Sequence, residues 1–99
     1  MRRFCYLAVA GASMEPTLHA GDWILARRDG RAVTGDVVVL EHPQRAGMLI
    51  VKRVERVDAD GFWVTGDALG ASTDSRHFGP VATVVGRVIW RVHPWGRIP

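Results

Sequence analysis

The chain has 99 residues, a formal net charge of +3 and 47% hydrophobic residues. This length allows one domain with a modest core, so we expect a single domain over residues 1–99. The only cysteine, Cys5, excludes an internal disulfide and a cysteine-rich metal site. The positive charge is mild and scattered along the chain, so we expect no nucleic-acid partner, no metal and no cofactor.

Short apolar runs alternate with turn residues along the whole chain, which is typical of an all-β protein. The expected strands cover residues 4–10, 23–27, 37–40, 48–57, 62–65 and 81–92. No segment has the length and the 3.6-residue period of a true helix. We therefore expect a small coiled antiparallel β-barrel or β-sandwich with little helix.

The first apolar run follows Arg2 and Arg3, as the apolar part of a signal peptide does. It has only about seven residues, far fewer than the ~20 that span a membrane. We expect a strand here, with no integral membrane segment. We also expect a cytoplasmic location, with peripheral membrane contact left open.

Tryptophans and histidines are expected in structural positions. Trp23, Trp63 and Trp90 fall within strands and should pack against the core or neighbouring strands, whereas Trp95 should be exposed. Gly86 is expected to mark a bulge in the last strand. The histidines show no metal-ligand spacing, and surface or loop positions are expected for all four: His19, His42, His77 and His93.

Ser13 is one of only three serines, and it heads the segment SMEPTL at residues 13–18, just after the first expected strand. A serine at the head of a tight turn exposes its hydroxyl beside unpaired backbone amides, which can bind a developing oxyanion. This position therefore suits a nucleophile. The alternative is that Ser13 only caps the turn.

Lys52 is the only lysine among 13 basic residues. Alternation along its strand places Ile50, Lys52 and Val54 on one face. Apolar neighbours favour the neutral form of a lysine, and a neutral lysine can take the proton of a serine hydroxyl, which an arginine cannot. The alternative is a surface lysine on an edge strand.

A polar loop over residues 66–80 contains the other two serines, Ser72 and Ser75. Asp74 and Arg76 in this loop can form a charge-assisted pair that fixes its conformation. The loop is thus a third candidate part of a site. The alternative is a solvated, turn-rich connection.

Together, four segments resemble the motifs of the signal peptidase I family of Ser–Lys proteases. SMEPTL at residues 13–18 is similar to the family's nucleophile motif, GDVVV at 35–39 to its next box, and KRV at 52–54 to its lysine box. In this chain GD at 66–67, followed by Ser72, Asp74, Ser75 and Arg76, is similar to the family's last box. The resemblance covers residues 11–80, in the family's order.

The resemblance implies a serine endopeptidase that removes an N-terminal leader or pro-segment from a precursor polypeptide. The precursor would bind as an extended strand, in a groove edged by the strands before Ser13 and before Lys52. Ser13 would be the nucleophile, Lys52 its general base, and Ser72 would orient the lysine nitrogen. The backbone at Ser13 and Gly11 would bind the oxyanion. Three residues would support the site without reacting: Asp74, Ser75 and Arg76.

The chain departs from the family in three ways. Many relatives have a hydroxyl residue two positions before the nucleophile, where this chain has Gly11, which leaves the second oxyanion donor open. Ala68 stands where the family has asparagine. The membrane anchors and the large β insertion of the bacterial enzyme have no counterpart. This compactness resembles the branch of the family that matures nickel-type superoxide dismutase, so we expect that precursor as the substrate.

Two other functions fit parts of the pattern. A self-cleaving repressor domain of the LexA type also uses a Ser–Lys pair, but it requires a DNA-binding domain and a cleavage segment upstream, and twelve residues precede Ser13. A basic β-barrel with exposed tryptophans could instead bind single-stranded nucleic acid. That function would need neither Ser13 nor Lys52.

Overall fold

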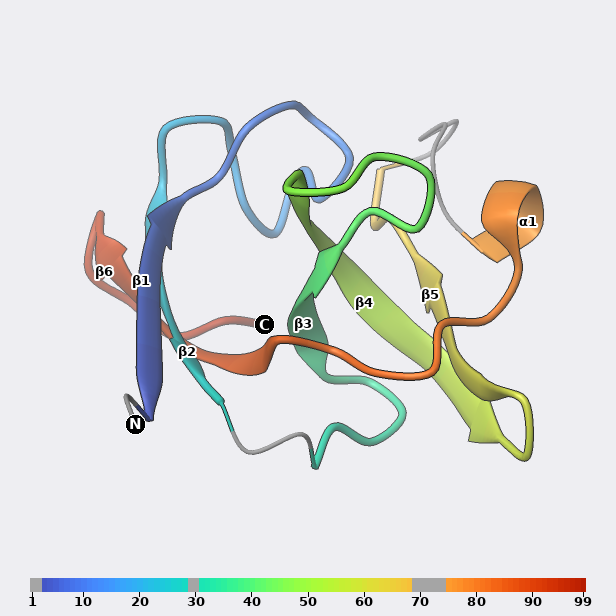
Figure 1. Ribbon diagram of the computed structural model, residues 1–99. Coiled ribbons are helices and arrows are strands. Elements are labelled where there is room, and N and C mark those ends of the chain that lie inside the picture. The colour runs from blue at the N-terminus through green and yellow to red at the C-terminus, as the bar shows by residue number, and fades with distance from the viewer. Residues whose placement is uncertain (1–2, 29–30, 69–74) are drawn as a thin grey trace.

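A computed structural model describes residues 3–28, 31–68 and 75–99, and within these ranges the chain forms one six-stranded antiparallel sheet with a single short helix (Figure 1). The strands are β1 (Phe4–Ala8), β2 (Trp23–Arg27), β3 (Val37–Glu41), β4 (Leu49–Asp58), β5 (Gly61–Thr65) and β6 (Gly86–His93). The helix α1 (Ser75–Phe78) has four residues. Across the sheet the order is β1-β2-β6-β3-β4-β5. The all-β prediction is confirmed.

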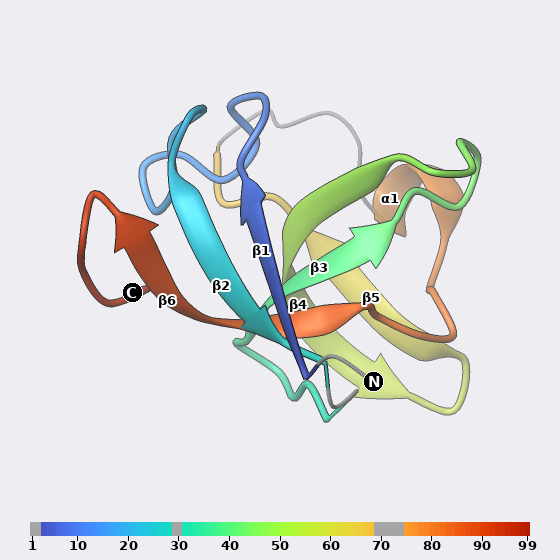
Figure 2. The ribbon, with the colours of Figure 1, turned by 60° about the vertical axis from the view of Figure 1, so that its left-hand side comes forward.

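The central strand β3 is buried on both faces. Val37 and Val39 belong to one hydrophobic cluster, whereas Val38 and Leu40 belong to another. A strand that is covered on both faces needs apolar residues at every position, which explains why residues 37–40 do not alternate between apolar and polar side chains. Around these clusters the sheet coils, with β1 and β2 on one side of β3 and β4 and β5 on the other (Figure 2).

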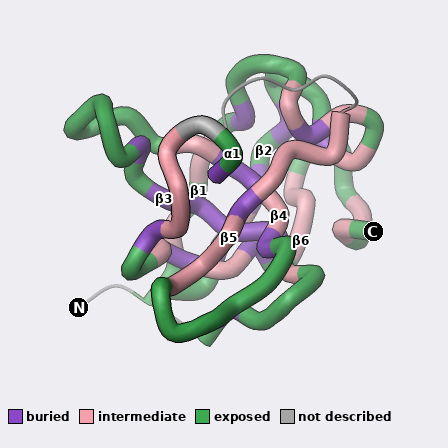
Figure 3. Tube along the Cα trace, turned by 90° about the vertical axis from the view of Figure 1, so that its right-hand side faces the viewer, coloured by how far each residue is buried: buried purple, intermediate pink, exposed green. Residues whose placement is uncertain are grey.

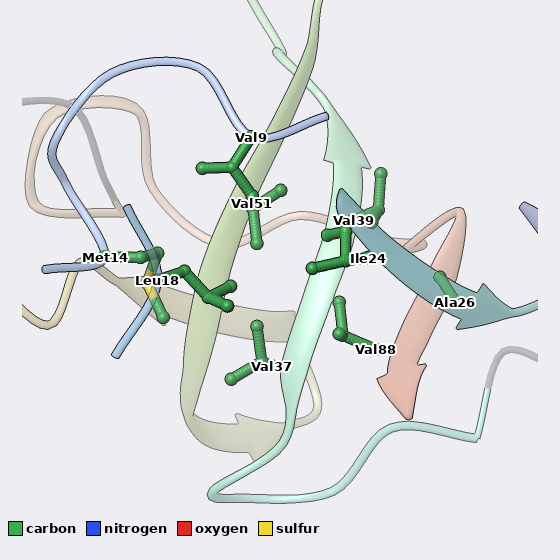
Figure 4. Packing of buried hydrophobic residues seen from close by; sticks show 9 residues of the cluster. All are labelled: Val9, Met14, Leu18, Ile24, Ala26, Val37, Val39, Val51 and Val88. Carbon is green, nitrogen blue, oxygen red and sulfur yellow. The ribbon is translucent and has the colours of Figure 1, made fainter. Parts of the chain in front are cut away.

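The first core cluster links the chain before Ser13 to the strand that carries Lys52. Its buried members are Val9, Met14, Leu18, Ile24, Ala26, Val37, Val39, Val51 and Val88 (Figure 4). Val9 lies four residues before Ser13, and Val51 lies one residue before Lys52. Burial of this cluster therefore brings two distant segments of the chain to one part of the fold.

The last strand begins later than expected. β6 starts at Gly86, and Val81 only forms an isolated bridge with Phe62. Two register shifts do occur between β2 and β6, but Gly86 is not their site. A Cβ on Gly86 would lie 2.8 Å from the carbonyl oxygen of Arg27, so this glycine allows a close backbone approach instead of a bulge.

The other strand boundaries differ from the expected ranges by at most two residues. Buried residues gather along the middle of the sheet, and exposed residues follow the loops at its rim (Figure 3). In the described ranges, no helix is long and apolar enough to cross a membrane.

Candidate active site

Ser13 lies in the turn after β1, and buried side chains anchor this turn. Met14 and Leu18 are 1% and 0% exposed, and both belong to the first core cluster. The backbone amide of Leu18 donates a hydrogen bond to the carbonyl oxygen of Met14 at 2.9 Å. Gly11, two residues before Ser13, has a φ of +77°, a conformation that favours glycine. Ser13 itself is half-buried, so its position is fixed by its neighbours while part of it stays accessible.

Lys52 is buried within β4, with 3% of its surface exposed. It lies opposite Val38 in the ladder between β3 and β4, and Ile50 lies opposite Leu40. The register thus confirms that Lys52 shares a face with apolar residues. Removal of an ammonium group from water disfavours its charged form, which is the condition that a lysine base requires.

One pocket contains both residues. It has a volume of about 220 Å³ and takes its walls from the end of β1, the β3–β4 connection and the first half of β4. Its lining residues are Leu7, Ala8, Ala10, Ser13, His42, Arg45, Met48, Leu49, Ile50, Val51 and Lys52. Ser13 and Lys52, which are 39 positions apart in the sequence, thus meet at the same cavity.

A bridge of charged residues joins the Ser13 turn to β4. The guanidinium of Arg53 donates to both carboxylate oxygens of Asp67, at 2.8 and 2.7 Å. The hydroxyl of Thr17 donates to the same carboxylate at 2.5 Å. These bonds hold the pKa of Asp67 below its usual range, and the bond to Asp67 raises the pKa of Arg53. One residue further on, the amide of Ala68 donates to the carbonyl oxygen of Ser13 at 2.9 Å.

Sequence reasoning gave Arg53 and Asp67 no role, although both lie inside the family-like boxes. The signal was present as charged residues directly after Lys52 and Gly66. Only the fold shows that they pair. Their pairing places the Gly66–Asp67 box beside the nucleophile turn.

The loop after β5 is only partly described. Ser72 and Asp74 lie outside the described residues, and so does the predicted pair of Asp74 with Arg76. Ser75 is 4% exposed, and its hydroxyl oxygen accepts a hydrogen bond from the amide of Val64 at 2.8 Å. Ser75 thus fixes the start of α1 against β5. Arg76 is exposed on α1.

His42 is a pocket residue that sequence reasoning missed. We expected a surface or loop position, and His42 does lie on the β3–β4 connection. It is not at the surface, however: it is 7% exposed and lines the pocket with Ser13 and Lys52. A lone histidine after an apolar strand gives no sequence signal for this role. Among the described residues, no group of histidine, cysteine and carboxylate side chains could hold a metal ion.

Comparison with known proteins identifies the class. Residues 2–89 match the Peptidase S24-like family, and the chain belongs to this family of serine-type peptidases.

Its relatives include subunits of mitochondrial inner membrane proteases. The chain is 36% identical to the mitochondrial ATP-independent inner membrane protease subunit 1a of Arabidopsis thaliana, over 87% of this chain and 68% of the relative. It is 32% identical to the mitochondrial inner membrane protease subunit 1 of Xenopus tropicalis, over 86% and 66%. It is 29% identical to subunit 2 of Mus musculus, over 95% and 71%.

These relatives correct one prediction. The expected cytoplasmic location is wrong, because the relatives are named as membrane proteases and point to a membrane-associated location. The prediction relied on the shortness of the apolar run at the N-terminus. The length of one segment does not tell whether a protein works at a membrane surface.

Proposed function

We propose that this protein is a serine endopeptidase in which Ser13 is the nucleophile and Lys52 the general base, and that it removes an N-terminal segment from a precursor protein. The observation that carries the proposal is the shared pocket of Ser13 and a buried Lys52. In water, a lysine would stay protonated near neutral pH and could not act as a base. Burial on an apolar face supplies the environment in which it can.

In the proposed reaction, the Ser13 hydroxyl oxygen bonds to the scissile carbonyl carbon while Lys52 takes the hydroxyl proton. The backbone amide of Ser13 donates to the oxyanion, and the space beside Gly11, where a Cβ would meet no atom within 4 Å, leaves room for it. When the carbon–nitrogen bond breaks, the protonated Lys52 returns its proton to the leaving amine. Water then hydrolyses the acyl-enzyme, again with Lys52 as base. We assign Ser72 to the orientation of Lys52, and Asp74, Ser75 and Arg76 to support of the site.

The walls of the pocket favour small apolar side chains near the cleaved bond. The lining includes Leu7, Ala8 and Ala10, from β1 and the chain just after it, and Ile50 and Val51 from β4. β1 is an edge strand, so an extended peptide can pair with its free edge and place alternate side chains in the pocket. We therefore propose alanine-like residues at positions −1 and −3 of the precursor.

We also place the enzyme at a membrane surface. The outward positions of β1 and β2 carry Phe4, Tyr6 and Trp23, which are 49%, 55% and 38% exposed. Tyr6 stacks on Trp23 at 4.8 Å, and Trp95, which is 73% exposed, packs edge-on against Trp90 of β6 at 5.2 Å. These five residues form what we call the aromatic face.

The aromatic face has the composition of a membrane interface. Tyrosine and tryptophan concentrate at the level of lipid headgroups, and arginine suits anionic lipids. Arg27, opposite Phe4 in the β1–β2 ladder, adds positive charge to this face. Ala8 belongs to β1 and also lines the pocket, so a docked membrane would lie next to the bound precursor.

The test is cleavage of a peptide library with alanine at −1 and −3, read by mass spectrometry. The proposal predicts cuts after alanine that disappear in Ser13→Ala, with a loss of at least about 10³-fold. Precursors of nickel superoxide dismutase and of membrane-tethered proteins are added as separate substrates, because the relatives are named for a membrane and not for a dismutase. Cuts that persist in Ser13→Ala, or that prefer large residues at both positions, would contradict the proposal.

A further inference from the structure

The pocket has a second polar end, away from Ser13 and Lys52. His42 and Arg45 line it there, on the β3–β4 connection. Between the two ends the lining is apolar, with Ile50 and Leu49 among its residues. A pocket that only held small residues beside the cut would not need this end.

The strand register gives the distance between the two ends. Lys52 lies opposite Val38, and the ladder continues until the amide of His42 donates to the carbonyl oxygen of Met48 at 2.8 Å. His42 is four residues beyond Val38, and an even number of steps keeps it on the same face. Four residues of extended chain span about 13 Å. An extended precursor with its −1 residue beside Lys52 would therefore bring its −5 residue to this end.

His42 is held as a hydrogen-bond donor. Its Nδ1 accepts a hydrogen bond from the amide of Gln44 at 3.0 Å, so the neutral ring carries its proton on Nε2. The ring also packs against Phe78 with the centroids 5.6 Å apart. Both contacts fix the plane of the imidazole. The Nε2–H group is therefore already held in place, and ligand binding need not cost further side-chain entropy at His42.

Arg45 supplies a positive charge at the same end. Its amide donates to the carbonyl oxygen of His42 at 3.1 Å, and its carbonyl oxygen accepts from the amide of Met48 at 3.1 Å, so the backbone of this connection is fixed. The side chain is exposed, and in the described part of the chain no carboxylate pairs with it. Among the pocket-lining residues that the structure describes, none is Asp or Glu.

We infer that His42 and Arg45 form a subsite for an acidic side chain of the precursor, about four residues before the residue at the cleaved bond. This inference rests on the proposed function, because that function places the part of the precursor before the cut in the pocket. A carboxylate accepts hydrogen bonds from both a guanidinium and an imidazole N–H, and it would balance the positive charge of Arg45. Glu and Asp are both suitable, and Asn would keep only the hydrogen bonds.

The test compares peptides with alanine at −1 and −3 that differ only at −5. We expect kcat/KM to be about fivefold higher for the peptide with Asp at −5 than for the peptide with Asn, and to be lowest for the peptide with Lys. The difference should arise from KM and not from kcat. Asp at −4 should have no effect, because neighbouring side chains of a strand point to opposite faces. Raised salt should reduce the Asp preference, since this end of the pocket is open to solvent.

Variants of the subsite identify the residues responsible. Arg45→Glu should reverse the preference to Lys at −5, whereas the matched control Arg28→Glu makes the same charge change at an exposed arginine that does not line the pocket. His42→Phe should lower the Asp preference, and His42→Gln should keep part of it. Circular dichroism checks that each variant folds, and the control Arg28→Glu should keep the wild-type preference for Asp at −5.

Binding to Ser13→Ala separates this inference from the proposed function. The inactive variant should bind the Asp peptide about fivefold more tightly than the Asn peptide, by fluorescence anisotropy. Absence of cleavage by the wild type would overturn the protease proposal and leave this binding result to decide the subsite. Equal affinity for Asp, Asn and Lys at −5, or an Asp preference that persists in Arg45→Glu, would overturn the subsite.

Discussion

Arg53 holds Asp67 through two hydrogen bonds, of 2.8 and 2.7 Å, and so ties the residue after the buried lysine to the loop beside the nucleophile. Ala68, next in the chain, donates to the carbonyl oxygen of Ser13 at 2.9 Å. The bridge thus sets the position of the Ser13 turn relative to β4. Removal of the bridge should affect both stability and activity.

Arg53→Gln and Asp67→Asn should each lower the free energy of unfolding by about 1–3 kcal/mol, because each leaves a partly buried charged partner without its bonds. The double variant should lose less than the sum, since the two residues form one interaction. Cleavage should fall in all three variants through misplacement of the Ser13 turn. Urea unfolding and kcat/KM measure the two effects.

The matched control for the bridge is the pair of Arg56 and Asp58, which lie 3.5 Å apart on the β4–β5 hairpin with side chains 55% and 40% exposed. Arg56→Gln should leave cleavage unchanged. Equal effects of Arg56→Gln and Arg53→Gln on kcat/KM would show that the Arg53–Asp67 bridge has no special part in the site.

Acid should remove the contribution of Asp67 to stability. Its pKa in the folded protein is lowered by Arg53 and by Thr17, whereas the unfolded chain has a value of about 3.9. The stabilisation is therefore complete above the unfolded value and is lost as the pH falls through the folded value. The stability difference between the wild type and Asp67→Asn should be large at pH 7 and should shrink below about pH 4. A difference that stays constant down to pH 2 would exclude a charged Asp67 as its source.

The aromatic face should bind lipid. Vesicles that contain phosphatidylglycerol should shift the tryptophan emission to shorter wavelength. A double variant that combines Tyr6→Ser and Trp23→Ser should bind the vesicles about tenfold more weakly. The control is Trp63→Phe, because Trp63 lies on β5 under Arg56 and outside this face. Unchanged binding in the double variant would exclude the face. Loss of single-stranded DNA binding in the same variant would favour the nucleic-acid alternative instead.

Much of the fold follows from local sequence. Turn residues and apolar runs place five of the six strands within two residues, because each run is bounded by Gly, Pro or Asp. β6 was harder, since residues 81–85 are as apolar as the strand but are used in a connection and a single bridge. The two-sided burial of β3 follows from its uninterrupted valines.

The site could be predicted only in part. Ser13 and Lys52 stand out because serines are few and the lysine is unique, so scarcity and a motif suffice to select them as candidates, and the structure brings both to one pocket. The pairing of Arg53 with Asp67 depends on how β4 and the loop after β5 approach each other in space, which no local sequence pattern indicates. His42 reaches the pocket only because the β3–β4 ladder continues to Met48. Trp23 does pack against a neighbouring strand, through its stack on Tyr6, but it stays 38% exposed, because strand propensity does not tell which face of a sheet is covered.

Cleavage should depend on pH through Lys52. The rate should rise with pH as Lys52 loses its proton, and it should reach half its maximum below ~10.4, the value of an unperturbed lysine. The same profile should hold for substrates with different residues at −5, because that subsite acts on binding. A flat rate from mildly acidic to alkaline pH would argue against a lysine base.

The most direct test of the Ser–Lys pair is the rate of precursor cleavage by Lys52→Arg. Arginine keeps the positive charge and most of the length of lysine, but it does not give up its proton. We predict that Lys52→Arg is as inactive as Lys52→Ala and Ser13→Ala, at least about 10³-fold below the wild type, with each variant folded by circular dichroism. A Lys52→Arg variant that keeps a tenth or more of the wild-type rate would exclude Lys52 as the general base.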